Sequence, residues 1–592
     1  MKESHLAVVI RNRVKKYGNR TAVKFKEENI YKELSWKELG TRIESVAQYL
    51  ISQGINSFAN IGIYSHNCPE WSITDFGILS TRGVVVPIFP TSTLDQLEYI
   101  VTETEMEILF VGDEIQLSNA VKALKSCSSL KKIITFFEHK SDHKQIIAFN
   151  DILNSAYNKK SKQILDQRLS EADKDDLATI IYTSGTTGEP KGVMLNHSHF
   201  LKLFEIHEIR LELGEDDVSL AFLPLSHVFE RGWSYFVFYS GATNVYNANP
   251  KDIIHELPKI KPTVMCAVPR FFEKSYDIIL KTAEKWNKPK RYIFNWAVKT
   301  GMQYIEYEKD SLTPPLALQL KHKLVNILVM KNFKKVFGGQ IKYMPCAGAA
   351  LNLDILKFFH ALGLKINYGY GATETTATVS CMKKDKYDFV NTGSIMPDVQ
   401  VKINEEDGQI LVKGDTVFKG YYQKPEATAE VLKDGWYYTG DQGEIPEEGV
   451  LLMKERIKDI MKTSTGKYVS PQKIELHLSQ CQQIEQLCVI GDNRRYLTAL
   501  IVPCFIYLKS LHKQNNGQVE NHDLVNNPIA IEEFQKKFDA LQENLAPYEK
   551  VVKFKLLPEP FTIENNLMTN SLKVRRKQVN IKYKELIEEM YK

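Results

Sequence analysis

Strand-like and helix-like segments alternate along the first 170 residues, and this alternation constrains the fold more than any other feature. The apolar run NIGIYS at 60–65 is followed by a helical pattern over 69–83 and then by the apolar run VVVPIF at 84–89. A strand, a helix and a second strand at this spacing form a right-handed crossover that joins two parallel strands. The sequence therefore predicts an α/β body of parallel β-sheets flanked by helices.

A capped helix precedes this unit. Ser35 stands before an apolar repeat at helical spacing, Glu38 follows three residues later, and Gly54 ends the pattern. A Ser followed by a Glu at this distance is typical of a capping box, so a helix is expected over 35–54. Further strands are expected at TVMCAVP (263–269), IKYMPCAG (341–348) and LKINYGYG (364–371), and helices over 278–335.

The pattern of expected strands and helices changes after residue 441. Short strand-like runs follow one another at GVLLMKE (449–455), QLCVIGD (486–492) and LTALIVPC (497–504). Such runs are typical of a smaller α+β unit, and about 134 residues is an ordinary size for a domain. We therefore expect an N-terminal body over 1–458 and a C-terminal domain over 459–592.

Composition excludes several classes of protein. Of 592 residues, 43% are hydrophobic and 25% charged, which excludes collagen-like, disordered and coiled-coil chains. The net charge is +5, from 77 basic and 72 acidic residues, and this small excess argues against a nucleic-acid-binding protein. The last twenty residues hold seven basic and three acidic side chains. Contact of this basic tail with anionic lipid stays open.

Cysteine usage and hydropathy indicate the compartment. Eight cysteines are scattered without a CxxC pair, so a disulfide scaffold or metal cluster is not expected and a reducing compartment fits. Arg and Lys interrupt the short apolar run near the start, and no stretch of about 18 apolar residues occurs. We expect a cytoplasmic protein; a peripheral contact with the inner face of the membrane is an open alternative, as is the oligomeric state.

The segment from 178 to 197 carries the strongest chemical motif. A β-branched strand runs into a loop composed of Thr183, Ser184, Gly185, Thr186, Thr187, Gly188, Glu189, Pro190 and Lys191. Four hydroxyls and several flexible N–H groups at one strand end can bind the oxygens of a polyphosphate. Gly188 is not followed directly by Lys and Ser or Thr, so this is not a Walker loop. A plain turn is the alternative reading of a loop with this composition.

The string YTSGTTGEPKG at 182–192 resembles the phosphate loop of the acyl-adenylate-forming superfamily, which includes acyl-CoA synthetases, luciferases and adenylation domains of peptide synthetases. The resemblance implies that the loop binds ATP through Thr183, Ser184, Gly185, Thr187, Gly188 and Lys191. It also implies that Thr186 belongs to the catalytic set. Further motifs extend the resemblance from the helix at 35–54 to Lys573.

Residues 368–374, YGYGATE, are similar to the family's YGxTE motif. The resemblance implies that Tyr370 stacks on adenine, that Gly371 and Thr373 line the nucleotide site, and that Glu374 holds Mg²⁺ and is catalytic. A carboxylate is the hard oxygen ligand that Mg²⁺ takes beside substrate phosphates. Without the motif around it, Glu374 would be read as a solvated surface acid.

Two motifs near the domain boundary resemble the family's ribose site. Asp441 ends the string YTGD, and Arg456 opens the string RIKD, which ends at Asp459. One carboxylate can accept from both hydroxyls of a cis-diol, so the resemblance places Asp441 and Arg456 on the ribose. It places Asp459 at a hinge.

Weaker similarities concern the acyl and CoA sites. Gly348 and Ala349 stand where the family has a wall of small residues against adenine and the acyl group. His227 ends the string LPLSH and is given a binding role near the acyl carboxylate, with packing or helix capping as the alternative. Gly466 is placed beside the path of the CoA pantetheine.

The family has a catalytic lysine near its C-terminus, and Lys573 is the matching position. Its motif is altered here, because residues 564–573 read ENNLMTNSLK. A cation at that position offsets the negative charge that builds up during adenylation. Lys577 is the alternative lysine, while Arg575, Arg576 and Lys577 are expected to form a basic surface helix.

The resemblance implies an AMP-forming ligase with a mobile C-terminal lid and an active site between body and lid. A fatty carboxylate would react with Mg²⁺-ATP to give acyl-AMP, and CoA would then displace AMP, without a protein nucleophile. Strings at 226–231 and 463–472 resemble long-chain fatty acyl-CoA synthetases. The alternatives are an acyl-AMP ligase that serves a carrier protein, a medium-chain or aryl acyl-CoA synthetase, a P-loop kinase or ATPase, and an inactive acyl-binding protein.

Overall fold

The computed structural model describes residues 3–139, 143–154, 158–183, 189–247, 249, 252–384, 387–479, 481, 483–511, 520–543, 545–570 and 573–592. These residues form two compact units. The first holds residues 1–404, 410–439 and 444–453, and the second holds 405–409, 440–443 and 454–592. The chain thus crosses from one unit to the other several times near residue 440.

A seven-stranded sheet organises the first part of the larger unit. Its order is β7 (Ile146–Ala148), β6 (Lys132–Thr135), β5 (Ile108–Val111), β3 (Asn60–Tyr64), β4 (Val84–Ile88), β8 (Leu177–Thr183) and β9 (Lys191–Asn196). All neighbours are parallel except β8 and β9, which are antiparallel. The predicted crossover is confirmed, since α3 (Pro69–Ser80) joins the parallel strands β3 and β4.

Three further sheets complete the larger unit. The first has the order β10 (Val218–Ala221), β11 (Thr243–Tyr246), β1 (Thr21–Glu27) and β2 (Ile30–Ser35). The second has the order β12 (Met344–Cys346), β13 (Ile366–Tyr370), β14 (Ser380–Cys381) and β15 (Ser394–Ile395). The third contains β16 (Gln400–Ile403), β17 (Gln409–Lys413), β19 (Trp436–Glu444), β18 (Leu432–Lys433) and, paired with β19, β20 (Leu452–Arg456). The border between the two units runs through β17, β19 and β20.

The predicted strand at 263–269 is wrong in extent. Only Val264 and Ala267 pair, as isolated bridges to neighbouring strands. Pro262 and Pro269 bracket the segment and lack the N–H groups that a longer ladder would need. Strands are present within the ranges expected at 341–348 and 364–371, but they are shorter, as β12 (Met344–Cys346) and β13 (Ile366–Tyr370).

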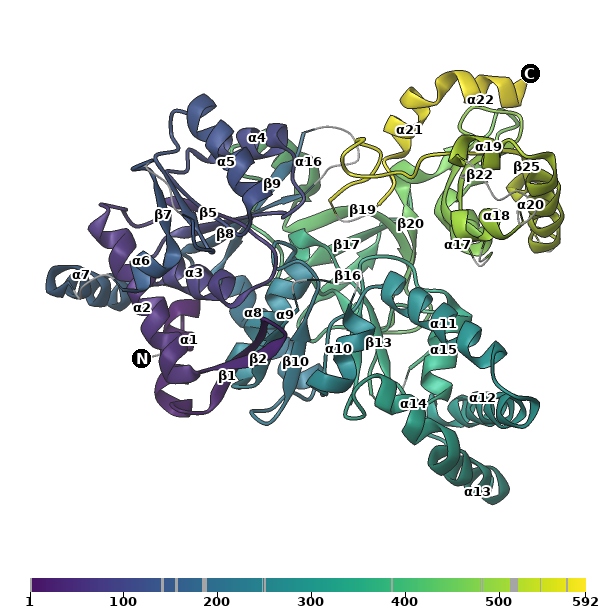
Figure 1. The fold of residues 1–592 in the computed structure, drawn as a ribbon, viewed down its shortest axis with the longest axis horizontal. Coiled ribbons are helices and arrows are strands. Elements are labelled where there is room, and N and C mark those ends of the chain that lie inside the picture. The colour runs from purple at the N-terminus through teal and green to yellow at the C-terminus, as the bar shows by residue number, and fades with distance from the viewer. Residues whose placement is uncertain are drawn as a thin grey trace. The chain divides into compact units, whose positions relative to one another are not determined.

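Helices surround the sheets of the larger unit (Figure 1). They are α1 (Leu6–Tyr17), α2 (Trp36–Ser52), α3, α4 (Leu94–Thr104), α5 (Glu114–Ser126), α6 (Phe149–Leu153), α7 (Lys159–Ser170), α8 (His197–Arg210), α9 (Val228–Ser240), α10 (Ile253–Ile260), α11 (Pro269–Glu284), α12 (Lys288–Glu308), α13 (Leu316–Val325), α14 (Lys331–Val336), α15 (Leu353–Ala361) and α16 (Pro425–Val431). The capping box at Ser35 and Glu38 and the helical character of 278–335 are confirmed.

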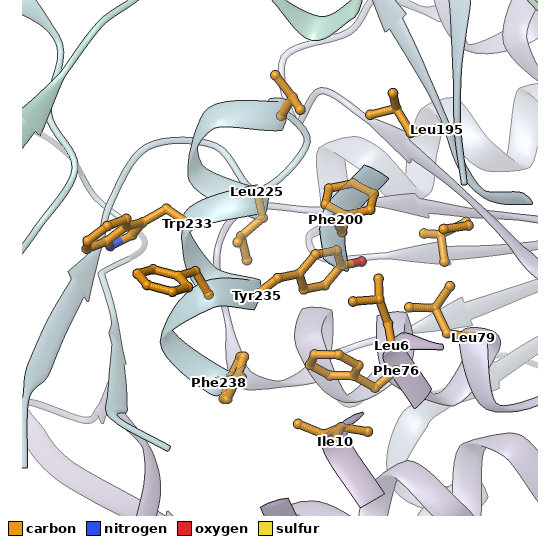
Figure 2. Close-up of a cluster of buried hydrophobic side chains, with 14 of the residues drawn as sticks. Leu6, Ile10, Phe76, Leu79, Leu195, Phe200, Leu225, Trp233, Tyr235 and Phe238 are labelled. Carbon is orange, nitrogen blue, oxygen red and sulfur yellow. The ribbon is translucent and has the colours of Figure 1, made fainter. Parts of the chain in front are cut away.

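Helices α1, α3, α8 and α9 meet in one aromatic-rich core (Figure 2). Phe76 of α3 packs edge-on against Phe238 of α9, and Phe200 of α8 packs edge-on against Tyr235 of α9. These side chains are nearly or fully buried. Burial of aromatic side chains supplies large apolar areas, so this core fixes α9 against the sheet that ends in the predicted phosphate loop.

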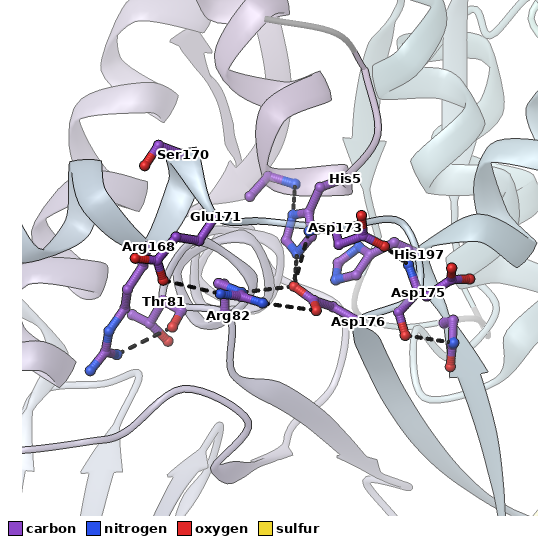
Figure 3. Close-up of polar contacts among 12 residues, drawn as sticks. His5, Thr81, Arg82, Arg168, Ser170, Glu171, Asp173, Asp175, Asp176 and His197 are labelled. Carbon is purple, nitrogen blue, oxygen red and sulfur yellow. Dashed lines mark hydrogen bonds and ion pairs between the residues drawn. The ribbon is translucent and has the colours of Figure 1, made fainter.

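A polar cluster joins the N-terminal segment to the same core (Figure 3). The buried rings of His5 and His197 lie 3.4 Å apart between centroids, and the backbone N–H of Leu6 donates to Nδ1 of His197 at 3.2 Å. Arg82 donates from Nε and Nη2 to the two carboxylate oxygens of Asp176, which lies 4.0 Å from Nε2 of His5. Burial lowers the pKa of His5 to about 4 and that of His197 well below its usual value, so both rings are neutral.

The smaller unit is an α+β domain. Strands β23 (Ile484–Ile490) and β24 (Leu497–Pro503) are antiparallel, and β25 (Val551–Leu556) is parallel to β24. A short hairpin of β21 (Met461–Lys462) and β22 (Tyr468–Val469) precedes them. The helices are α17 (Pro471–Leu478), α18 (Phe505–Leu511), α19 (Asn521–Val525), α20 (Pro528–Leu541), α21 (Arg576–Lys582) and α22 (Lys584–Tyr591).

Candidate active site

The predicted phosphate loop joins the antiparallel strands β8 and β9. Ser184, Gly185, Thr186, Thr187 and Gly188 lie outside the described residues. The two ends of the loop are described: Thr183 and Lys191 are paired across the strands, and the Thr183 hydroxyl donates to the carbonyl of Lys191 at 3.4 Å. Tyr99 of α4 donates to the carbonyl of Pro190 at 3.2 Å, a contact that sequence reasoning missed.

A second predicted motif follows β13. Glu374 and Thr373 lie in a 3₁₀ turn at Thr373–Thr375, directly after the strand that ends at Tyr370. A Cβ at Gly371 would come 1.9 Å from the carbonyl oxygen of Ala377, so only glycine fits this position. The Tyr370 ring is largely buried, and its role against adenine stays a prediction.

Gly348 and Ala349 lie at the same sheet edge. They follow β12, which is parallel to β13, so the two segments leave the sheet side by side. Gly348 has φ +94°, and a Cβ at this position would come no closer than 4.0 Å, to Cγ1 of Val268, as expected of a wall that a planar group can approach. The Tyr368 hydroxyl donates to the carbonyl of Ala349 at 3.2 Å and accepts from the N–H of Leu351 at 3.3 Å. Tyr368 therefore positions this wall.

Tyr421 connects Lys191 with Glu374. Its hydroxyl donates to Oε1 of Glu374 at 2.9 Å, and Nζ of Lys191 lies 4.9 Å from the centre of its ring. The segment that carries Tyr421 pairs with β9, since the N–H of Tyr422 donates to the carbonyl of Gly192 at 2.7 Å. A cation and a carboxylate from two distant motifs are thus brought to one aromatic side chain.

Sequence reasoning missed Tyr421. Its string, GYYQK, has no feature that distinguishes it from an ordinary surface turn. The one sequence signal near Tyr421 is the preceding Gly420, which marks an unusual backbone conformation. Gly420 has φ +138°, and its carbonyl accepts from the N–H of Met194 at 3.1 Å. That contact depends on pairing with β9, which is more than 200 residues away.

His227 caps the N-terminus of α9. Its Nδ1 accepts from the N–H of Phe229 at 3.2 Å, which is the capping alternative considered for this residue. The acyl-binding role stays a prediction. The neighbouring Arg231 is fully buried and bonds to Asp75 of α3 and to the hydroxyl of Thr179 in β8, at 2.5 and 2.6 Å. Arg231 thus connects α9 to the strand that leads into the predicted phosphate loop.

The predicted ribose-site residues meet within the smaller unit. Nε of Arg456 donates to Oδ1 of Asp441 at 3.1 Å. Asp441 is 4% exposed, whereas the Arg456 side chain is 43% exposed. A charge-assisted hydrogen bond of this kind orients the carboxylate. The structure therefore brings together two residues that the sequence assigned to one ligand.

Lys573 belongs to the same electrostatic environment. Lys573 is bonded to Thr569 in both directions: the N–H of Lys573 donates to Oγ1 of Thr569, and the N–H of Thr569 donates to the carbonyl of Lys573. The residue as a whole is exposed, but desolvation of its ammonium group by the surrounding protein, followed by the charge of Arg456, lowers the pKa of Lys573 to about 8. Asp441 and Asp459 act on it in the opposite direction.

The expectation of a basic surface helix at 575–577 is wrong for Arg576. Its guanidinium donates to both carboxylate oxygens of Glu475, at 2.6 and 3.0 Å, and to the carbonyl of Val489. Its side chain is 20% exposed and joins α21 to α17. Lys577 is exposed, as expected.

The remaining predicted residues lie in turns of the smaller unit. Asp459 ends a 3₁₀ turn, and its Oδ2 accepts from Nε2 of Gln472 at 2.8 Å. Gly466 has φ +81° in the loop between β21 and β22, a conformation that favours glycine. The positions of Asp459 and Gly466 are compatible with a hinge and with a loop glycine, and both roles stay predictions.

The donor set fits a magnesium ion that is bound mainly by substrate phosphates. Within the described residues, no three His, Cys, Asp or Glu side chains lie together in a way that could hold a metal ion. Mg²⁺ in phosphoryl-transfer sites usually takes one or two carboxylates, with phosphate and water oxygens completing the shell. The partly buried carboxylate of Glu374 fits such a single ligand.

Family models match both the N-terminal and the C-terminal part of the chain. The family model described as AMP-binding enzyme matches residues 10–422, and that described as AMP-binding enzyme C-terminal domain matches residues 458–592. The long-chain-fatty-acid–CoA ligase FadD15 of Mycobacterium bovis is 31% identical over 95% of this chain and 93% of its own. The peroxisomal long chain acyl-CoA synthetase 7 of Arabidopsis thaliana is 28% identical over 95% of this chain and 82% of its own.

Solved structures share the fold at lower identity. The adenylation domain of a carboxylate reductase from Mycobacterium chelonae superimposes with a TM-score of 0.76 at 21% identity, covering 100% of this chain and 92% of that one. The anthranilate CoA ligase AuaEII, solved with anthranoyl-AMP, gives 0.74 at 17% identity, covering 99% and 98%. Sequence motifs, fold and whole-length relatives agree, and the chain belongs to the AMP-binding enzyme family.

Proposed function

We propose that this protein is a long-chain fatty acid–CoA ligase. In the first half-reaction, a carboxylate oxygen of the fatty acid attacks the α-phosphorus of ATP, and the bond to pyrophosphate breaks. In the second, the thiolate sulfur of CoA attacks the acyl carbon, and AMP leaves with the carboxylate oxygen. Neither step needs a covalent bond to the protein, so positioning and charge neutralisation are its main tasks.

The observation that carries the proposal is the grouping of Lys191, Tyr421 and Glu374. Polyphosphate needs a cation and a metal-binding carboxylate that are held apart, because direct pairing would neutralise both. The Tyr421 ring separates the two while its hydroxyl orients the carboxylate. In this proposal, the loop residues 183–188 donate to phosphate oxygens and Lys191 adds positive charge.

The smaller unit would supply the ribose contacts and the catalytic cation. The Asp441 carboxylate would accept from both ribose hydroxyls, with Arg456 fixing its orientation. The Lys573 side chain would stabilise the charge that develops between the fatty carboxylate and the α-phosphate. Residues 459–592 would then change position about Asp459, so that the loop of Gly466 lines the pantetheine path.

Magnesium, ATP, CoA and a fatty acid complete the proposal. Mg²⁺, held by Glu374 and the phosphates, would supply charge neutralisation for the leaving pyrophosphate. A cytoplasmic location with a peripheral contact at the inner face of the membrane belongs to the same proposal. No helix in the described part of the chain combines the length and apolar character needed to cross a bilayer.

Long-chain specificity is supported by the relatives named long-chain ligases, which match nearly the whole chain. Pyrophosphate release from ATP with fatty acids of increasing length tests the first half-reaction, and CoA dependence of thioester formation tests the second. A peak of activity with medium-chain or aryl acids would reject the long-chain assignment. Pyrophosphate release without acyl-CoA formation would favour an acyl-AMP ligase that serves a carrier protein.

A further inference from the structure

A row of exposed leucines runs along one side of α13 and of the π-helical turn that continues it. Leu316, Leu320, Leu324 and Leu328 recur at intervals of four residues and are 77%, 70%, 49% and 49% exposed. Side chains four residues apart lie on the same side of a helix. Ile327, which is 55% exposed, widens the row in the π-helical turn Asn326–Met330 that continues α13. We call these five residues the apolar row.

The opposite side of this helix is anchored in the larger unit. The rings of Tyr304 in α12 and His322 in α13 are stacked with their centroids 3.7 Å apart. Val325 and Met330 are buried against Ala297 of α12. In Figure 1, α12 and α13 lie together at the outer end of the teal region. The apolar row therefore faces outward because the other side of the helix is already packed.

The segment around the apolar row is strongly basic. Residues 285–353 contain twelve Lys and Arg side chains but three acidic ones, a surplus of nine. From 311 to 353 there are six lysines and no acidic residue. The last twenty residues have a surplus of four, so the segment 285–353 holds the larger total surplus of positive charge. Lys321, Lys323, Lys331 and Lys335 are exposed and border the apolar row in sequence.

We propose that the apolar row and its lysines dock the protein on an anionic lipid bilayer. An amphipathic helix lies in the bilayer interface with its apolar side among the acyl chains and its cations at the headgroups. Negative lipid headgroups complement the surplus of positive charge. This proposal gives a surface to the peripheral membrane contact named in the proposed function, and it rests on that function only for the origin of the substrate.

Charge and shape favour a membrane over other occupants. A second copy of the chain would bring two surfaces of the same sign together, which opposes association. Nucleic acid would match the lysines but would leave the five apolar side chains without partners, since its binding depends on phosphate and base contacts. A bilayer satisfies both the leucines and the lysines.

Sedimentation of the full-length protein with vesicles tests the proposal without ATP or CoA. We expect binding to phosphatidylcholine vesicles that contain about 30% phosphatidylglycerol and weak binding to vesicles of phosphatidylcholine alone. Raising the salt from about 0.1 M to about 0.5 M should weaken binding by screening the lysines. The triple variant Leu320→Gln, Leu324→Gln, Leu328→Gln should lose at least about tenfold in partition coefficient, because glutamine keeps the helix but not the apolar area.

Matched controls separate the surface from general effects. The triple variant Ile115→Gln, Ile209→Gln, Ile506→Gln removes exposed apolar side chains elsewhere, which are 76%, 70% and 83% exposed, and should bind as the parent does. A second comparison uses two quadruple variants in which lysines are replaced by glutamine. The first changes Lys321, Lys323, Lys331 and Lys335, and the second changes the exposed Lys122, Lys125, Lys159 and Lys160. The first set should lose binding to anionic vesicles, and the second should keep most of it.

Three outcomes would overturn the proposal. They are a parent protein that binds neither vesicle, a leucine variant that binds as the parent does, and a dimer in solution that the leucine variant abolishes while no vesicles are bound. The last outcome would make the apolar row a contact between copies. Vesicle binding by a protein that shows no ligase activity would leave this inference standing and reject the proposed function.

Discussion

The hydroxyl of Tyr421 donates a hydrogen bond to Oε1 of Glu374 at 2.9 Å, while Nζ of Lys191 lies 4.9 Å from the centre of the same tyrosine ring. The buried Tyr421 side chain thus contacts both Glu374, in the turn after β13, and Lys191, at the start of β9. Both groups belong to motifs assigned to ATP and its metal. Tyr421 is therefore a positioning residue. Its hydroxyl contacts Glu374 and its ring contacts Lys191, so a substitution that removes only the hydroxyl tests the first contact alone.

The Tyr421→Phe variant should slow adenylation while leaving the fold intact. It removes the hydrogen bond to Glu374 but keeps the ring beside Lys191. Hydrogen bonds to charged groups contribute about 1.5–3 kcal/mol, so kcat/KM for ATP should fall at least about tenfold. The Mg²⁺ concentration needed for half-maximal rate should also rise. Pyrophosphate release during Mg²⁺ titration measures both.

Tyr422→Phe is the matched control, since the Tyr422 hydroxyl accepts a hydrogen bond from Nδ2 of Asn60 at 3.3 Å, away from the Tyr421–Glu374 pair. It should retain the activity of the parent. Identical magnesium titrations for Tyr421→Phe and the parent would show that the tyrosine hydroxyl does not orient a metal ligand.

Asp441→Ala should weaken ATP binding. Two ribose hydroxyls would lose their acceptor in a buried environment, costing about 1–3 kcal/mol, and KM for ATP should rise accordingly. Arg456→Lys should give a smaller rise, because it removes the Nε donor that orients the Asp441 carboxylate. Asp434→Asn, at an exposed aspartate, is the control. An unchanged KM for ATP in Asp441→Ala would remove this residue from the ribose site.

Lys573→Ala should separate the two half-reactions. Charge develops between carboxylate and α-phosphate in the first step alone, so acyl-AMP formation should be nearly abolished. The conversion of supplied acyl-AMP and CoA to acyl-CoA should continue at a substantial rate. Lys577→Ala serves as the control, four residues away on the exposed side of α21. Equal loss of both half-reactions would contradict the division of labour, and loss in Lys577→Ala alone would move the catalytic assignment to that residue.

The first half-reaction should slow as the pH rises through about 8. The pKa of Lys573 is lowered to about 8, so its ammonium form is replaced by the neutral amine above that value. Only the charged form can stabilise the developing negative charge. In Lys573→Arg the guanidinium stays charged, and the alkaline fall should move to higher pH. Single-turnover pyrophosphate release across pH 6.5–9.5 measures the effect; the same alkaline fall in both proteins would assign it to another group.

Acid should destabilise the larger unit through His5 and His197. Their pKa values are lowered by burial, to about 4 for His5, so the unfolded chain binds protons below pH about 6.5 that the folded chain does not. Stability is therefore lost as the pH falls from about 6.5 towards 4. For His5 alone the loss between pH 7 and 5 is about 2 kcal/mol.

Urea unfolding at several pH values measures this dependence. His5→Gln should be less stable at pH 7 but should show a shallower decline towards pH 5. His255→Gln, at an exposed histidine, should leave the decline unchanged. A decline in His5→Gln as steep as that of the parent would show that other groups cause the acid sensitivity.

Local sequence determined the elements whose signals lie close together in the chain. Ser35 and Glu38 start α2 because a cap needs residues three apart, and the apolar runs at 60–65 and 84–89 form parallel strands because the helix between them has the length of a crossover. The motifs around Lys191, Glu374, Asp441 and Lys573 were likewise visible, since each is a short string. Such strings are specific enough to indicate the family without any tertiary contact.

Tertiary structure decided which residues hold those motifs in place. Tyr421 contacts Glu374 because residues 420–422 pair with β9. Arg576 is largely buried because its guanidinium bonds to Glu475 of α17. The apolar row faces outward because α12 packs against the other side of α13. Short-range patterns follow from backbone geometry and propensity, whereas partners separated by tens to hundreds of residues are chosen by packing, which no local string encodes.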